Sequence, residues 1–227
     1  MTNVNVATQG VIFLSVVGKL YGRVLIKRVT AGTECAIRQE QCGFRQGRGC
    51  MDQVFAVRQV WEKYLANGKD VFWALIDLEK AYDTIDRHGM WQMLRVYGVC
   101  GKLLKAVQSF YVDSRVCVLV GNDVSEKIPV NVGLRQGCVM SPWLINVYMD
   151  GVVREENVVL ELLIANGGRF EINQLLFADD IALAAVPEEK LCRLVSEFGR
   201  VMGIKSNGGR LHVIINCEPL EEVDCFK

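Results

Sequence analysis

The stretch that most constrains the fold is Glu171 to Val186, EINQLLFADDIALAAV, in which two adjacent aspartates interrupt an otherwise mainly apolar run. The apolar residues on either side predict two short β-strands, so Asp179 and Asp180 are expected at the bend of a hairpin. One aspartate is enough to stabilise a turn, because its side chain can bond to its own backbone. Two adjacent carboxylates repel one another unless a cation lies between them. A simple turn and a metal site are equally good explanations on spacing alone.

A third aspartate follows a second apolar stretch. Val71 to Ile76 has the composition of a buried central strand, and Asp77 comes directly after it. A carboxylate at the end of a buried strand needs a counter-charge or a metal ion, because an unpaired buried charge is costly. Asp83 and Asp86 have a simpler explanation: either can cap the helix predicted to run through Met90 to Gly98.

Composition excludes several classes of protein. With 227 residues, 51% of them hydrophobic and 23% charged, the chain fits one large domain or two small subdomains with a substantial core. The apolar runs near the start are too short to span a bilayer, and no basic stretch precedes them as in a secretion signal. Nine cysteines without a C-x-x-C pair argue against a disulfide scaffold and a zinc site. An intracellular protein with reduced thiols is therefore expected.

The charges are balanced overall but not locally. The 26 basic and 26 acidic residues give a net charge of zero, which does not by itself indicate nucleic-acid binding. Residues 1–50 carry seven Lys or Arg against two Glu, an excess of five. This end of the chain could meet a polyanion, and a solvated basic helix face explains the excess equally well.

Hydrophobic spacing and turn residues predict the other elements. Helices are expected at 16–29, 51–65, 102–111 and 188–202 and from Ser141-Pro142 onward, with Ser141 as N-cap; strands are expected at 115–120, 124–130 and 211–215. The loop Gln41–Cys50 contains three glycines and two arginines, Arg45 and Arg48. Glycine lets a backbone approach a ligand, and arginine offers a planar fork to phosphate oxygens. Gln136-Gly137 lies in a second loop of this kind.

Four segments, in this order, resemble successive motifs of reverse transcriptases: GFRQGRG at 43–49, ALIDLEKAYD at 74–83, GLRQGCVMSPWLINVYMD at 133–150 and LLFADD at 175–180. The match is to enzymes of non-LTR retrotransposons, LINE-like and jockey-type, and FLSVVGKLYGRVL at 13–25 is similar to the fingers segment that precedes these motifs. The resemblance covers roughly residues 13–202. It implies an α+β fold with the fingers and palm of a right-hand polymerase, in which helices flank an antiparallel palm sheet. Residues 1–70 then correspond to partial fingers, 71–202 to the palm with fingers elements inserted, and 203–227 to an incomplete end of the palm.

The resemblance also implies an activity and a set of site residues. The family copies an RNA template from a DNA primer with deoxynucleoside triphosphates, using two Mg²⁺ ions held by aspartates. Asp77, Asp179 and Asp180 match those catalytic ligands. Tyr82 matches the aromatic residue that blocks a ribose 2′-hydroxyl, and ordinary packing is its alternative explanation. Gln136 and Gly137 match the loop against the incoming nucleotide and template, and Arg45 and Arg48 match a fingers loop that touches template or triphosphate, or else are surface charge.

Several departures from the family pattern point to truncation at both ends. Gln9 to Leu14 lacks the arginine of the family's opening segment. Residues 203–211 can be laid on the family's lysine turn only with Arg210 in place of the lysine; otherwise the turn is deleted and Phe226-Lys227 is a primer grip cut short. Either way the thumb is absent. The alternative to an enzyme is thus a degenerate, inactive retroelement fragment with at most weak nucleic-acid binding.

Two further expectations complete the sequence-based hypothesis. A two-metal nuclease could use the same aspartates, but it leaves Tyr82 and Gln136-Gly137 without explanation. Family members act at a nicked chromosomal target, so the resemblance implies a nuclear site, although no signal in the sequence indicates one.

Overall fold

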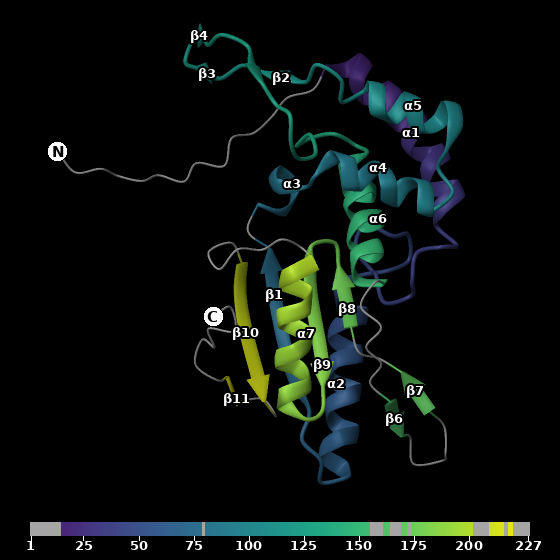
Figure 1. Ribbon diagram of the computed structural model, residues 1–227, viewed down its shortest axis with the longest axis vertical. Coiled ribbons are helices and arrows are strands. Elements are labelled where there is room, and N and C mark those ends of the chain that lie inside the picture. The colour runs from purple at the N-terminus through teal and green to yellow at the C-terminus, as the bar shows by residue number, and fades with distance from the viewer. Residues whose placement is uncertain are drawn as a thin grey trace, which may run out of the picture.

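A five-stranded antiparallel sheet forms the centre of the computed structural model, with the strands in the order β11-β10-β1-β9-β8 (Figure 1). The structure describes residues 15–78, 80–154 and 174–201, together with the backbone of four short stretches, 161–163, 169–171, 209–215 and 218–219. The strands of this sheet are β1 (Phe72–Leu78), β8 (Gln174–Phe177), β9 (Asp180–Ala185), β10 (Gly209–Ile215) and β11 (Glu218–Pro219).

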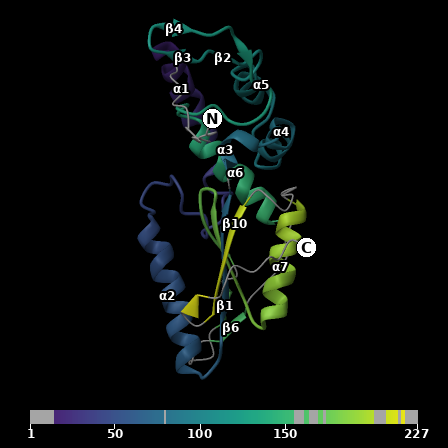
Figure 2. The same cartoon turned by 90° about the vertical axis from the view of Figure 1, so that its left-hand side faces the viewer.

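Helices cover both faces of the sheet. In both views α2 (Cys50–Ala66) and α7 (Glu188–Val201) lie on opposite faces (Figure 1, Figure 2). The remaining helices, most of them beyond one end of the sheet, are α1 (Val16–Thr33), α3 (Ala81–Thr84), α4 (Arg87–Val96), α5 (Gly101–Ser109) and α6 (Ser141–Arg154). Small two-stranded ladders are formed by β2 (Arg115–Val116) with β5 (Ile128–Pro129), β3 (Leu119–Val120) with β4 (Asp123–Val124), and β6 (Glu161–Leu163) with β7 (Arg169–Glu171).

The two faces of the sheet belong to different apolar clusters. Because side chains alternate along a strand, Ala74, Ile76 and Leu78 of β1 point into a large core that also includes side chains of α1, α4, α5, α6 and α7. Trp73 points to the other face, into a small cluster under α2. Leu75 and Asp77 share the face of Trp73 but are exposed, so α2 covers only part of that face.

Local sequence signals explain where the helices begin. The Ser15 hydroxyl accepts a hydrogen bond from the Gly18 N–H, and the Asp86 carboxylate accepts from the N–H groups of His88 and Gly89, so each residue caps its helix. In α7 the apolar residues at helical spacing, Leu191, Leu194, Val195 and Phe198, are all buried. The predicted hairpin, the buried strand after Val71 and the helices are thus confirmed in kind, as is the capping role of Asp86.

Several predicted boundaries and roles differ in the structure. Asp77 lies within β1, which continues to Leu78. Asp180 is the first residue of β9 and pairs with Phe177, so the turn consists of Ala178 and Asp179. Ser141 does not act as an N-cap: it is the first residue of α6, and its hydroxyl donates to the Arg135 carbonyl.

Two broader differences concern segments between the helices. The strands expected at 115–120 and 124–130 are each broken into two short pieces. The stretch between α6 and β8, for which no strand was predicted, contains β6 and β7. The predictions for residues 1–14, for 203–208 of the lysine turn and for Phe226-Lys227 fall outside the described residues, whereas Arg210, expected in that turn, lies in β10 opposite Asp77. None of the helices in the described part of the chain is both long enough and apolar enough to cross a membrane.

Candidate active site

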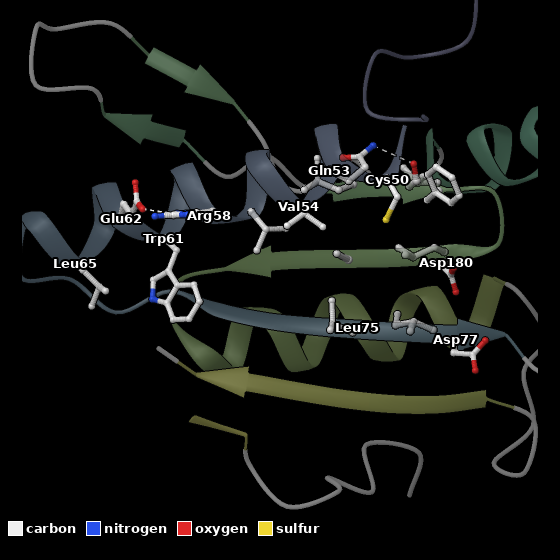
Figure 3. A pocket seen from close by; sticks show the side chains of 17 residues that line it. Cys50, Gln53, Val54, Arg58, Trp61, Glu62, Leu65, Leu75, Asp77 and Asp180 are labelled. Atoms are coloured by element: carbon white, nitrogen blue, oxygen red, sulfur yellow. Dashed lines mark hydrogen bonds and ion pairs between the residues drawn. The ribbon is translucent and has the colours of Figure 1, made fainter. Parts of the chain in front are cut away.

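Asp77 and Asp180 lie on neighbouring strands and on the same face of the sheet. The register that pairs Ile76 of β1 with Ile181 of β9 brings Asp77 opposite Asp180 at the next position. Both carboxylates lie at one end of a groove between α2 and the sheet, and Figure 3 shows them on adjacent ribbons there. Two strands that are distant in sequence therefore bring these acids together, as the sequence predicted.

The third acid, Asp179, is electrostatically coupled to the other two. Partial burial raises the pKa of the Asp179 carboxyl, a hydrogen bond from its own backbone opposes the rise, and the charge on Asp77 adds to it. Partial burial also raises the pKa of Asp180, and the charges of Asp179 and Asp77 add to that rise. The three carboxylates thus repel one another, and a cation among them would relieve the repulsion.

The groove beside these acids was not predicted from the sequence. It has a volume of about 760 Å³ and runs between α2 and strands β1, β8 and β9, from Trp61 and Leu65 at one end to Asp77 and Asp180 at the other (Figure 3). Its walls include the exposed apolar side chains of Val54 and Leu75. Asp77 and Asp180 therefore adjoin an accessible apolar surface. The helical spacing of α2 alone could not show that its apolar face is only partly covered.

The loop Gln41–Cys50 holds the turn of the aspartate hairpin in place through hydrogen bonds. The buried Gln41 side chain accepts hydrogen bonds from the N–H groups of Gly43 and Ala178, both at 2.9 Å, and its amide nitrogen donates to the Ala178 carbonyl at 3.3 Å. A Cβ on Gly43 would lie 2.3 Å from the Ala178 nitrogen. Close approach does require this glycine, but the partner is the hairpin turn rather than a ligand. The loop thereby fixes Ala178, which has a positive φ of 60°, directly before Asp179.

The two arginines of this loop have different surroundings. Arg45 is buried, and its guanidinium donates to the Glu34 carboxylate at 2.9 Å and to the carbonyls of Arg38 and Gln41. Its contacts therefore hold the loop together. Arg48 is exposed and donates to the backbone and side-chain oxygens of Gln39. The structure does not bring either guanidinium into a contact with the aspartates, so a role for Arg45 and Arg48 at template or triphosphate stays a prediction.

Tyr82 is close enough to the acids to interact with them. Its side chain is half-buried, and burial raises the pKa of its hydroxyl to about 12, with a further contribution from the charge on Asp179. The phenol therefore stays protonated at neutral pH. Tyr82 thus lies near Asp179, and its role in blocking a ribose 2′-hydroxyl stays a prediction.

Gln136 is joined to the segment that carries Tyr82. Its amide nitrogen donates to both carboxylate oxygens of Asp83, at 3.0 and 3.2 Å, and the Leu134 N–H donates to the Tyr82 carbonyl at 2.6 Å. Gly137 follows, exposed and with a φ of +71°. Of the two aspartates that could cap α4, Asp86 does so, whereas the Asp83 carboxylate binds a side chain 53 residues further along the chain.

The donor set fits a hard divalent cation, although the carboxylates are not gathered around one point. Carboxylate oxygens are the ligands that Mg²⁺ prefers, and Asp77, Asp179 and Asp180 supply six of them. Within the part of the chain that the structure describes, no three Asp, Glu, His or Cys side chains are close enough to form a metal-binding group as placed.

Comparison with known proteins gives results consistent with this geometry. The sequence model of the family described as "Reverse transcriptase (RNA-dependent DNA polymerase)" matches residues 9–207. The "Retrovirus-related Pol polyprotein from type-2 retrotransposable element R2DM" of Drosophila melanogaster is 26% identical over 203 residues, which is 88% of this chain and 19% of that protein. A polyprotein from a type-1 retrotransposable element R2 of Nasonia vitripennis is 26% identical over 179 residues, covering 78% of this chain and 17% of that protein. The chain thus spans about a fifth of the length of these relatives.

A solved structure shows the same fold at low sequence identity. Telomerase from Candida albicans, solved with a TWJ fragment of telomeric RNA, superposes with a TM-score of 0.52 at 10% identity, over 88% of this chain and 34% of that chain. At this identity the likeness concerns the fold alone. The family match covers most of the chain, including all three aspartates, Tyr82 and Gln136. The chain belongs to the reverse transcriptase (RNA-dependent DNA polymerase) family.

Proposed function

We propose that this chain is the reverse transcriptase domain of a non-LTR retrotransposon and that it extends a DNA primer along an RNA template with deoxynucleoside triphosphates. The observation that carries the proposal is the register that brings Asp77 opposite Asp180 at the end of the groove, with Asp179 in the adjoining turn, in a chain whose residues 9–207 match the family. Coupled carboxylates on adjacent strands suit nucleotidyl transfer, in which the protein mainly positions charged groups.

The three aspartates are assigned the role of holding divalent cations. Magnesium bound there would neutralise the triphosphate and favour attack by the primer 3′-hydroxyl. Asp77 and Asp180 contribute from neighbouring strands, while Asp179 contributes from the turn that Gln41 holds. Carboxylates fixed on rigid elements lose little freedom when they meet the cation, which favours a defined geometry.

Tyr82, Gln136 and Gly137 are assigned to the incoming nucleotide. The half-buried Tyr82 ring adjoins Asp179, where it can limit the space around a sugar 2′-hydroxyl. Gly137 has no side chain to obstruct a planar or phosphorylated ligand, and its positive φ suits glycine. Exposed Arg48 is the better placed of the two loop arginines to meet template or triphosphate, because Arg45 is buried in the loop.

In the family's terms, residues 1–70 are assigned to the fingers and 71–202 to the palm. The relatives reported above are R2 elements, and a jockey-type affiliation is a finer assignment that their names do not support. Their length makes this chain the counterpart of one part of a polyprotein. We expect the site of action to be nuclear, where a chromosomal primer is present.

Primer extension tests the proposal. The purified chain should extend a DNA primer annealed to an RNA template when Mg²⁺ and deoxynucleoside triphosphates are present. The variant Asp179→Asn should not, although it should remain folded by circular dichroism. Absence of extension by the folded wild-type chain would instead support the alternative, an inactive retroelement fragment.

A further inference from the structure

Residues 82–87 and 130–136 are tied together along their length. The Leu134 N–H donates to the Tyr82 carbonyl, and the Gly133 N–H donates to the Ile85 carbonyl at 2.9 Å. A Cβ on Gly133 would lie 2.5 Å from the Asp83 carbonyl oxygen, so only glycine allows this approach. The Arg87 guanidinium closes the far end by donating to the backbone carbonyls of Val130, Val132 and Gly133. The segment that carries Tyr82 and the one that carries Gln136 therefore move as one unit.

Within this unit, the Asp83 carboxylate determines how the Gln136 amide is turned. A carboxylate accepts hydrogen bonds but does not donate them, so the amide nitrogen of Gln136 must face Asp83 and its oxygen must face away. Both side chains are partly buried, so water competes only in part for this charged hydrogen bond. Among the described residues, the Gln136 amide oxygen has no hydrogen-bond partner and Asp83 has no side-chain partner other than Gln136.

We propose that Asp83 is a positioning residue: it holds the Gln136 amide so that its oxygen is presented to the incoming nucleotide as a hydrogen-bond acceptor. This inference rests on the proposed function. Asp83 itself touches no substrate. It lies next to Tyr82 in sequence and bonds to Gln136 in space, and so it links the two residues assigned to the nucleotide.

The expected effect is specific to nucleotide binding. Without Asp83 no other described residue fixes the Gln136 amide, so its oxygen is free to turn away from the nucleotide. A charge-assisted hydrogen bond of this kind corresponds to roughly a tenfold change in affinity or more. Asp83→Ala should therefore raise the KM for deoxynucleotide about tenfold while the KM for primer-template and kcat change less than about threefold.

The experiment combines kinetics with a direct observation of the amide. Asp83→Ala, Asp83→Asn, Gln136→Ala and the Asp83→Ala, Gln136→Ala double variant are compared with wild type, and exposed Asp113→Asn is the control for the loss of one carboxylate. The side-chain NH₂ signal of Gln136 is located in ¹H–¹⁵N spectra by its loss in Gln136→Ala. It should move in Asp83→Ala and stay in place in Asp113→Asn. Asp83→Asn keeps an acceptor oxygen and the side-chain volume, so its KM for deoxynucleotide and its Gln136 amide shift should lie between those of wild type and Asp83→Ala. It replaces Asp83→Ala in the comparison if Asp83→Ala does not fold.

A double-mutant cycle separates positioning from a structural role. If Asp83 acts through Gln136, Asp83→Ala should have no further effect on the deoxynucleotide KM in the Gln136→Ala background. Equal, additive effects in both backgrounds, or an unmoved Gln136 amide signal, would overturn the inference. A wild-type chain that extends no primer would overturn the proposed function and the nucleotide part of this inference, whereas the amide signal would still decide whether Asp83 holds Gln136.

Discussion

The two faces of the central sheet differ sharply although the same strands build both. On one face, Ile76 and Leu78 are at most 6% exposed and pack into the large core. On the other, Leu75 is 37% exposed and Asp77 is exposed as well, because α2 covers only part of this face and leaves a groove. Asp77 and Asp180 line that groove, and Asp179 precedes Asp180 in the hairpin turn. One face of the sheet thus packs into the core and stabilises the fold, whereas the other leaves its acidic side chains accessible to solvent.

The open face also differs from the helical layer beyond the end of the sheet in how carboxylates are paired. Asp150 of α6 is fully buried in that layer, where it accepts hydrogen bonds from Arg38, Arg154 and Tyr97. Asp179 and Asp180 have no ion pair among the side chains that the structure describes, and Asp77 lies opposite Arg210 of β10 in the register of the sheet. A buried carboxylate with complete pairing is a structural element, whereas coupled carboxylates without a counter-charge are suited to bind a cation.

The largest effect is expected on activity at the open face. Asp77→Asn and Asp179→Asn should each lower primer extension about 1,000-fold, because a bound metal supplies several kcal/mol of transition-state stabilisation and each 1.4 kcal/mol is tenfold in rate. Single-turnover extension on an RNA template measures this loss. The exposed Asp123→Asn is the control and should leave the rate within about twofold of wild type. Unchanged extension in the Asp77 or Asp179 variant would contradict a catalytic role for the acids near the open face.

The next effect concerns the paired carboxylate in the helical layer beyond the sheet. Asp150→Ala should lower the free energy of unfolding by about 4 kcal/mol, because it leaves the partly buried Arg38 and the buried Tyr97 hydroxyl without their acceptor. Urea denaturation monitored by circular dichroism gives this value. A loss below about 1 kcal/mol would show that the buried ion pair adds little to stability.

Adjacent residues on β1 provide a matched test of packing on the two faces. Ile76→Ala should cost about 3 kcal/mol of unfolding free energy, since it leaves a cavity in the core. Leu75→Ala, one position away, should cost less than about 1 kcal/mol because the side chain is already partly exposed. Urea denaturation of the two variants side by side decides the question. Equal losses would mean that the groove is closed in solution.

The smallest effect is a pH-dependent gain in stability. The pKa values of Asp179 and Asp180 are raised in the folded chain, so the folded state binds protons more readily than the unfolded state. The resulting penalty is absent below the unfolded pKa of about 4 and complete above the raised values. Without divalent cations, Asp180→Asn should therefore increase the unfolding free energy at pH 7 by less than about 0.5 kcal/mol, because Asp180 is solvent-exposed.

Denaturation of wild type and Asp180→Asn at pH 7 and pH 4 measures this difference. The gain should be smaller at the lower pH, because the carboxyl groups are partly protonated in both states. Destabilisation of Asp180→Asn at pH 7 would contradict mutual repulsion among the three acids.

The local parts of this arrangement could be predicted from the sequence. Alternating apolar residues and the two aspartates identified the hairpin, and periodicity together with Asp86 identified α4. The contacts that support the site could not be predicted in this way. Gln41 binds Ala178 and Asp83 binds Gln136 across 137 and 53 residues, and no local spacing encodes such partners.

Other misjudged features have the same cause. Gly43 was interpreted as a residue that approaches a ligand, and its true neighbour is the hairpin backbone. Arg45 looked like a phosphate-binding residue, but its donors are satisfied inside the loop. The residue type shows that a glycine allows close approach or that an arginine can donate hydrogen bonds. Only the fold shows which group is approached and which atoms accept those bonds. The residues proposed for catalysis were identified by their match to family motifs, whereas the residues that hold them in place were not identified.

The central claim, that Asp77, Asp179 and Asp180 form one cation site at the open face, is tested most directly by metal binding. Mn²⁺ accepts the same oxygen ligands as Mg²⁺, and the free ion is counted by electron paramagnetic resonance during a titration. Wild type and the control Asp123→Asn should remove Mn²⁺ from solution to the same extent, and Asp179→Asn should remove much less. Equal binding by wild type and Asp179→Asn would contradict the claim.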